Sequence, residues 1–92
     1  MMPYGGDPSE LAGRYVGPSR GGVTDLRIEA SGDTLLAREA GGEEADTLRH
    51  ASGLTWRHET DHYRFVRARD QIIELRLDVV GGHYVLRRVG EN

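Results

Sequence analysis

The chain contains no cysteine and no lysine, and these absences exclude several kinds of site. Without cysteine there can be no disulfide cross-link, no thiolate zinc site and no cysteine nucleophile. All twelve basic residues are arginine, whose planar guanidinium group suits paired and stacked contacts better than an ammonium group does.

Long apolar runs and an excess of one charge are also missing. No apolar stretch is long enough to span a bilayer, and no charged leader precedes an apolar segment at the N-terminus. The net charge is −3, with both signs interspersed, which is not the pattern of a nucleic-acid-binding surface. We therefore expect no membrane or nucleic-acid partner, and a cytoplasmic location by default.

The length of 92 residues suits one domain with a thin core, because chains of this size bury only about 60 to 65% of their unfolded surface. Glycine and proline give residues 1–6 little reason for order, so we expect a flexible tail there and a single domain over residues 7–90. A large enzyme cleft does not fit this size. We predict no catalytic residue, no metal and no cofactor.

A short helix is expected at the start of the domain. Asp7 is placed as its N-cap and Pro8 at its first position. Glu10 follows where a capping box needs it, and Gly13 ends the helix. Leu11 would then point into the fold or plug one end of it.

Short strands separated by turn residues follow. Alternation of apolar and polar residues predicts strands over residues 14–17, 23–30, 34–39 and 45–50. Residues 18–22 contain Pro18 and two glycines, so we expect a connection outside the sheet. The pattern does not decide which of Leu35 and Leu36 faces the core.

The clearest alternation lies in the C-terminal part of the chain, which predicts two hairpins. In the first, residues 60–61 form a two-residue loop. Trp56 then faces Phe65, and His58 faces Tyr63. These four side chains share one side of the sheet.

In the second hairpin, glycines at residues 81–82 supply the turn. Val79 then faces Tyr84, and Leu77 faces Leu86. The predicted inner side consists of Ile73, Leu75, Leu77, Val79, Tyr84 and Leu86.

These segments give about eight short strands at spacings of roughly 8 to 12 residues, which is typical of an all-β sandwich or barrel. Local hairpins favour an antiparallel up-and-down barrel, since closure leaves no exposed sheet edge. The predicted fold is a small all-β barrel with a short N-terminal helix.

Several residues occur in an order that resembles a known family. The markers are Leu-x-Gly-x-Tyr at residues 11–15, an aromatic-x-arginine strand at Phe65 and Arg67, and a closing strand that ends in Arg88. Over residues 9–90 the chain is similar to the lipocalin-like β-barrel domain appended to the C-terminus of serine β-lactamase-like hydrolases and related peptidases.

The resemblance implies a role without catalysis. In such proteins the catalytic serine and lysine lie in the partner domain, and the barrel shapes substrate access or assembly. This chain has no lysine and so no Ser-x-x-Lys motif. It is therefore expected to be a binding or accessory module that self-associates or docks on a hydrolase. Ala-Ser-Gly at residues 51–53 departs from the family's proline-containing turn, which leaves the start of the fifth strand less defined.

Residues 58–62, His-Glu-Thr-Asp-His, match the HExxH pattern of zinc peptidases. That chemistry needs a helix, because only one helical face points both imidazoles at a single zinc ion. Here the flanking residues alternate as in a strand, so a hairpin would place His58 and His62 on opposite faces. A small metal-dependent hydrolase using these two histidines is the distant alternative.

Two arginines, Arg67 and Arg88, lie on the predicted inner side. If residues 68–70 connect the sixth and seventh strands, Tyr63 and Arg88 both face Leu75. An inner arginine suits a carboxylate ligand, because guanidinium offers a planar fork to both oxygens.

The second functional hypothesis is thus a carrier of a small apolar carboxylate, with Arg88, Tyr63 and His58 at the polar end of an inner pocket. In the simpler alternative, the arginines end their strands, and their head groups reach water or an internal acid such as Glu10.

The aromatic residues also allow two interpretations. They form either a wall around a ligand or simply the core, and an eight-stranded barrel is just wide enough for side chains to fill it or for one small ligand. The candidate ligand-binding residues are His58, Tyr63, Arg88, Trp56, Phe65, Tyr84 and Arg67.

Overall fold

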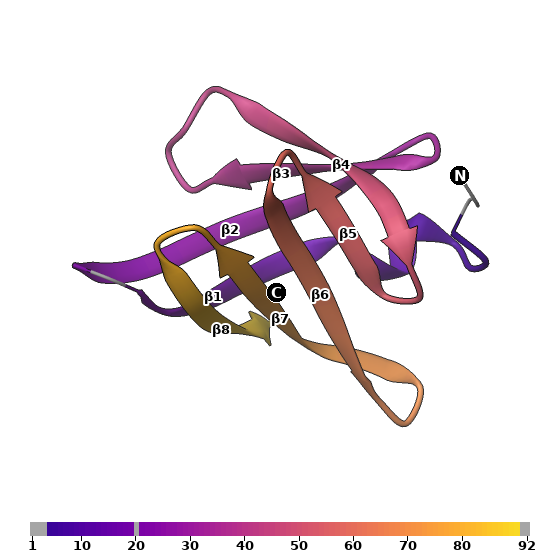
Figure 1. The fold of residues 1–92 in the computed structure, drawn as a ribbon. Helices are drawn as coiled ribbons and strands as arrows, with labels where there is room; N and C mark the ends of the chain where they lie inside the picture. Colours follow the sequence, from indigo (N-terminus) through magenta and orange to yellow (C-terminus); the bar gives the residue numbers. More distant parts are fainter. Residues whose placement is uncertain (1–3, 20, 91–92) are drawn as a thin grey trace.

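The computed structural model describes residues 4–19 and 21–90, and within them the chain forms eight strands that close into one antiparallel barrel (Figure 1). The strands are β1 (Gly13–Ser19), β2 (Gly22–Ser31), β3 (Thr34–Glu39), β4 (Ala45–Ser52), β5 (Thr55–His58), β6 (Asp61–Ala68), β7 (Gln71–Val79) and β8 (Gly82–Val89). Each strand pairs with its neighbours in the sequence, and β1 pairs with β8. The predicted all-β, up-and-down barrel is confirmed.

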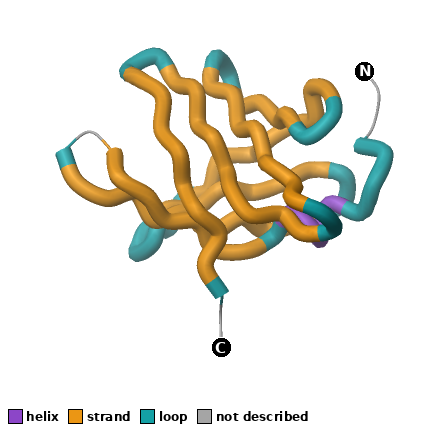
Figure 2. Tube along the Cα trace, turned by 90° about the horizontal axis from the view of Figure 1, so that it is seen from below, coloured by secondary structure: helices purple, strands orange, loops and turns teal. Residues whose placement is uncertain are grey.

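A 3-10 helix of four residues, η1 (Pro8–Leu11), precedes β1 at one end of the barrel, where Figure 2 shows it in purple. Asp7 caps it as predicted, because its Oδ1 accepts a hydrogen bond from the amide of Ser9 at 3.0 Å. The amide of Ala12 donates to the carbonyl of Ser9, so the chain leaves the turn for β1 before an α-helix can form. The predicted helix is thus a single 3-10 turn.

The inner positions of the strands supply the core. Successive strand residues point to opposite faces, and the buried set follows that period of two. Leu35 is buried and Leu36 is half-buried, which settles the choice that the sequence leaves open. The core consists of Leu11, Tyr15, Leu26, Ile28, Leu35, Ala37, Leu48, Trp56, Tyr63, Phe65, Ile72, Leu75, Leu77 and Leu86.

The predicted register of the first C-terminal hairpin is wrong by two residues. Glu59 and Thr60 form the loop, and Asp61 already belongs to β6. Trp56 therefore faces Tyr63 instead of Phe65. Because the shift is even, every side chain keeps its predicted face.

The second hairpin is shifted in the same way. Its loop is residues 80–81 rather than 81–82, because the second glycine continues the ladder as the partner of Val79. Leu77 consequently faces Tyr84 instead of Leu86. The inner faces of β7 and β8 again keep their predicted side.

The predicted inward position of Ile73 is wrong. A bulge interrupts the ladder between β6 and β7, where Val66 pairs with Glu74 but Arg67 pairs with Ile72. The extra residue reverses which side chains point into the barrel at the start of β7. Ile72 is therefore 4% exposed, while Ile73 is 43% exposed.

The predicted row across the wall is also wrong. Tyr63 faces Leu77 rather than Leu75, and Leu75 faces Leu86 rather than Arg88. The connection between β6 and β7 is one residue shorter than expected, since Ala68 already pairs with the first residue of β7.

Residues 18–19 extend β1 instead of forming the expected connection. Pro18 pairs with Val23, and Ser19 pairs with Gly22. Proline is tolerated there because the β8 ladder reaches only residues 14–16 of β1, so no partner on that side needs its missing amide hydrogen. Arg20, from the same predicted connection, lies outside the described residues.

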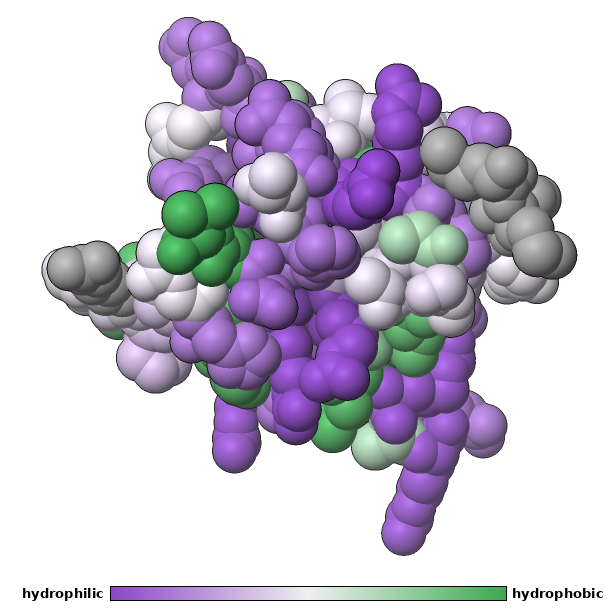
Figure 3. Space-filling view, in the orientation of Figure 1, coloured by the Kyte–Doolittle hydropathy of each residue, from purple (hydrophilic) through white to green (hydrophobic). Residues whose placement is uncertain are grey.

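The segment expected to be a flexible tail is described only from Tyr4 onward, which packs on the core; residues 1–3 lie outside the described part. In the described ranges, no helix is long and apolar enough to cross a membrane. Figure 3 shows a mainly hydrophilic face with apolar residues in small separate areas.

Candidate ligand-binding site

The end of the barrel that carries η1 is covered. Leu11 projects from η1 into the core and is fully buried. The hydroxyl of Tyr15 donates a hydrogen bond to the carbonyl of Leu11 at 2.8 Å. These contacts hold η1 across the barrel end, as the sequence predicts for Leu11.

Arg67 and Arg88 form hydrogen bonds that hold this covered end together, which differs from the ligand-binding role predicted for them. Arg67 Nη2 donates to Glu10 Oε1 at 2.6 Å, so the predicted alternative partner of the strand-end arginines is confirmed. Arg88 Nη2 donates to the carbonyl of Ala12 at 2.7 Å, and its Nη1 donates to that of Ile72 at 3.3 Å. Hydrogen bonds from Tyr4 and Arg67 hold the pKa of Glu10 below its usual range.

Trp56 and Phe65 lie in the packed interior, with 0% and 2% of their surface exposed. The ring of Phe65 packs edge-on against that of Tyr15, with centroids 5.6 Å apart. Trp56 contacts the rings of Tyr4 and His50. These two aromatic residues belong to the core.

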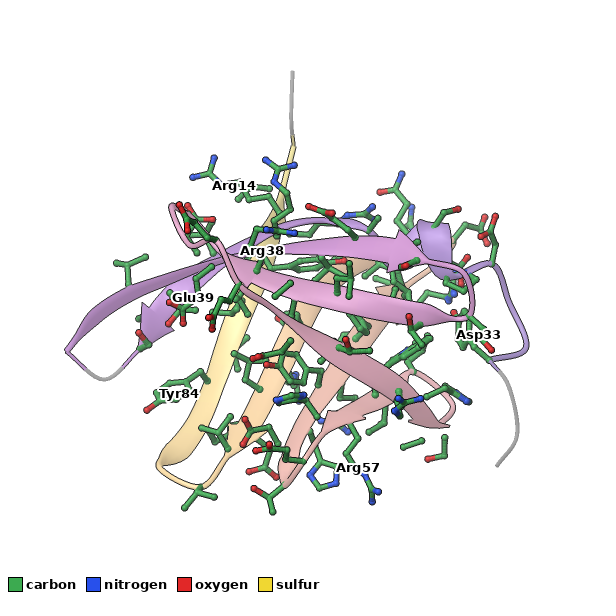
Figure 4. The ribbon with its side chains drawn as sticks, turned by 90° about the horizontal axis from the view of Figure 1, so that it is seen from above. Arg14, Asp33, Arg38, Glu39, Arg57 and Tyr84 are labelled. Atoms are coloured by element: carbon green, nitrogen blue, oxygen red, sulfur yellow. The ribbon has the colours of Figure 1, made fainter. Side chains whose placement is uncertain are left out.

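The opposite end is open and contains a cavity of about 550 Å³, which we call the mouth. Figure 4 shows Glu39 and Tyr84 at this end and Asp33 at the other. The mouth is lined by Thr24, Leu26, Ala37, Glu39, Gly42, Glu43, Glu44, Asp46, Asp61, Tyr63, Leu77, Val79 and Tyr84.

Three acidic residues of the mouth occupy inward-facing positions at strand ends. Glu39 ends β3 opposite the buried Leu26. Asp46 lies near the start of β4 opposite the buried Ala37. Asp61 begins β6, two residues before the buried Tyr63. Strand geometry thus directs three carboxylates, from β3, β4 and β6, toward one cavity.

Tyr63 brings a polar group to the floor of the mouth. It is 6% exposed and lines the cavity, yet its hydroxyl has no hydrogen-bond partner among the described residues. Burial and, to a smaller extent, the charges of Asp46, Asp61 and Glu39 together raise its pKa to about 12. The hydroxyl is therefore neutral at physiological pH and is free to bind a ligand atom.

His58 lies at the edge of the mouth. Its Nε2 is 3.6 Å from Asp46 Oδ1, and its Nδ1 contacts the carbonyl of Thr47 at 3.2 Å. His62 is exposed and pairs with Arg57 in the ladder. The two histidines of the HExxH match therefore point to opposite faces of a hairpin, as predicted from the alternation.

The structure thus divides the seven predicted site residues among three places. Tyr63 and Tyr84 line the mouth, and His58 flanks it. Two more are core residues, and the two arginines lie at the covered end. The predicted grouping of Arg88 with Tyr63 and His58 in one pocket is wrong, because it depends on the incorrect register.

Sequence reasoning missed the acidic residues of the mouth. A signal for them existed, since Glu39, Asp46 and Asp61 each lie two residues from a buried residue of the same strand, Ala37, Leu48 and Tyr63 respectively. Even spacing places them on the inner face.

Comparison of the chain with protein-family models, with curated proteins and with solved structures gave no significant match. The function is therefore inferred from the geometry of the mouth and the chemistry of its lining.

Proposed function

We propose that this chain is a noncatalytic binding module, a lipocalin-like barrel that holds one small ligand in its open mouth. The observation that carries the proposal is the cavity of about 550 Å³ at the end opposite η1. Ligand pockets typically measure about 300 to 1,000 Å³ and combine apolar walls with a few polar groups. Eight-stranded up-and-down barrels of the lipocalin type hold small ligands in the same way.

The lining of the mouth supports this function. Leu26, Ala37, Leu77 and Val79 provide apolar surface, and Tyr63 offers a hydroxyl that no described residue binds. The rest of the interior is packed with side chains, so a ligand is expected at the mouth rather than deep in the barrel.

An accessory role beside a serine hydrolase, or self-association, is a further part of the proposal. It is supported by the resemblance over residues 9–90 alone. The binding function of the mouth does not depend on it.

Binding can be tested by NMR titration of isotopically labelled protein with small aromatic and aliphatic compounds, in cationic, neutral and anionic forms. We expect at least one form to shift amide signals of the mouth, and we expect Ala37→Leu to abolish the shift by filling the cavity. Ala68→Leu, which adds the same volume at an exposed position, is the matched control. Tyr63→Phe, which removes a single oxygen, gives a second test if Ala37→Leu does not fold.

The proposal fails if no compound shifts the mouth signals. It also fails if Ala37→Leu folds and binds as the natural chain does. Equal losses in Ala37→Leu and Ala68→Leu would likewise contradict it, since only the first residue lines the mouth.

A further inference from the structure

The charges at the mouth are almost all of one sign. Five of its lining residues are acidic: Glu39, Glu43, Glu44, Asp46 and Asp61. Although the chain has twelve arginines, none of them is among the described residues that line this cavity. Two bases contact lining residues from outside the cavity: His58 Nε2 lies 3.6 Å from Asp46 Oδ1, and Arg38 Nη1 donates to the carbonyl of Glu43 at 2.9 Å.

These carboxylates are directed into the cavity by the strands that carry them. Glu39, Asp46 and Asp61 occupy inward positions on β3, β4 and β6. Side chains on an outer face would spread their charge into solvent, whereas these three line one open cavity. Clefts lined by one sign of charge focus the field and concentrate ions of the opposite sign.

Tyr63 supplies an independent indication of a ligand. Its side chain is more than nine-tenths buried, its hydroxyl has no partner in the described part of the chain, and it lines the mouth. Although the residue is buried as a whole, its hydroxyl oxygen reaches the cavity and is not one of the buried polar atoms that lack a partner. A donor from a ligand, placed between the hydroxyl and the surrounding carboxylates, could replace the water there.

The remaining surface of the mouth is apolar or aromatic. Leu26, Leu77 and Val79 form walls beside the carboxylates, and the ring of Tyr84 borders them from β8. A bare metal ion would leave these walls uncovered. In addition, no group of three or more potential metal ligands is close enough to hold an ion within the described residues.

We propose that the ligand is an organic monocation, a protonated amine or quaternary ammonium group that carries a short apolar or aromatic body. The carboxylates and the Tyr63 hydroxyl would bind the charged end, and the apolar walls would cover the body. Tyrosine rings add attraction, since their faces favour cations. This inference rests on the proposed binding function and specifies its ligand class.

Three compounds with the same phenethyl skeleton separate the alternatives: phenethylamine, phenethyl alcohol and phenylacetate. NMR titration should give mouth shifts with the amine and much weaker shifts with the other two. Higher salt should weaken amine binding, because salt screens partly exposed charges. Calcium chloride alone serves as the metal probe.

Neutral variants test the charges individually. Glu39→Gln and Asp46→Asn should each raise the Kd for phenethylamine about two- to five-fold, as expected for partly exposed ion pairs. Asp33→Asn removes the same charge at the opposite end of the barrel, where Asp33 is exposed, and should leave the Kd unchanged. Tyr63→Phe should weaken the binding of phenethylamine without strengthening the binding of phenethyl alcohol.

The outcomes distinguish the two proposals. Tighter binding of the alcohol or of phenylacetate overturns the cation inference and leaves the binding function standing. Mouth shifts with calcium and none with the amine also overturn it. If none of the compounds in either panel binds, both proposals fail. An equal effect of Asp33→Asn and Asp46→Asn contradicts the specific role of the mouth carboxylates.

Discussion

Gly17 determines how closely β1 approaches β8. A Cβ atom at this position would lie 2.3 Å from the carbonyl oxygen of Val85 and 2.9 Å from Cα of Leu86. Both are backbone atoms, which cannot rotate away as the end of a side chain can. The closure of the barrel therefore requires a residue without a side chain at this point.

We expect Gly17→Ala to lower the free energy of unfolding by about 1 to 3 kcal/mol, the usual cost of forcing extra atoms into a packed site. Urea denaturation followed by circular dichroism measures the change. Gly81→Ala is the matched control, because a Cβ atom there meets nothing within 4 Å. A similar loss in both variants would contradict this account of Gly17.

At the scale of the strands, four tight hairpin loops in the described part of the chain begin with a residue of positive φ. These residues are Gly32, Gly53, Glu59 and Arg69, with φ of 60°, 54°, 53° and 58°. Glycine adopts this conformation without steric cost, whereas other L-residues lose about 1 to 2 kcal/mol. The backbone conformation of Glu59 and Arg69 therefore lowers the stability of the folded state.

Glu59→Gly is expected to raise the free energy of unfolding by about 0.5 to 1 kcal/mol, because relief at positive φ exceeds the added entropy of the unfolded chain. The same substitution at Thr60, the next loop residue, should lower stability. Thermal unfolding of the two variants measures both changes. A stability gain at Thr60 as large as that at Glu59 would be inconsistent with the loop geometry.

This loop also explains where prediction from the sequence stops. The period of two gave the correct faces of Trp56, Tyr63 and Phe65, because burial depends on parity alone. It could not set the register, since a shift of two residues preserves every face. Turn propensity favoured Thr60 and Asp61, and nothing in the sequence marks a glutamate for positive φ.

The bulge in β7 could not be predicted from the sequence, for a different reason. Ile72 and Ile73 are adjacent and equally apolar, so the alternation cannot tell which one faces inward. The pairing of Arg67 with Ile72 decides it, and that pairing depends on the partner strand.

The candidate site was predictable only in part. Tyr63 and Tyr84 were placed correctly on the inner face, and inward parity also applies to Glu39 and Asp46. The sequence pattern alone does not show which barrel end η1 covers. Arg88 was consequently assigned to a ligand, although it binds the carbonyl groups of Ala12 and Ile72.

At the scale of the whole molecule, the two ends of the barrel each bury a tyrosine. Tyr15 lies at the covered end and Tyr63 at the mouth. Burial is the main cause that raises both pKa values from 10.0 to about 12. The folded state therefore disfavours the tyrosinate form at both ends.

A folded-state pKa above that of the unfolded chain gives stability that is complete below pH 10 and is lost as the pH approaches 12. We expect the barrel to lose stability in that interval. Ultraviolet absorbance of tyrosinate and circular dichroism should report ionisation and unfolding together. The double variant Tyr15→Phe/Tyr63→Phe should lose less of its own neutral-pH stability over this interval, and Tyr84→Phe should behave as the natural chain does. If the double variant loses stability with rising pH as the natural chain does, the two buried tyrosines are not the cause of the loss.

Contact between β1 and β8 has a kinetic consequence. Arg14, Tyr15 and Val16 pair with Val89, Arg88 and Arg87, whereas the other ladders join strands that follow one another along the chain. Closing so long a chain segment costs more entropy than forming a local hairpin. The hairpins are thus expected to form first as an open sheet, which then closes when β1 pairs with β8. Transient separation of β1 from β8 would admit solvent to the interior while the other ladders stay paired.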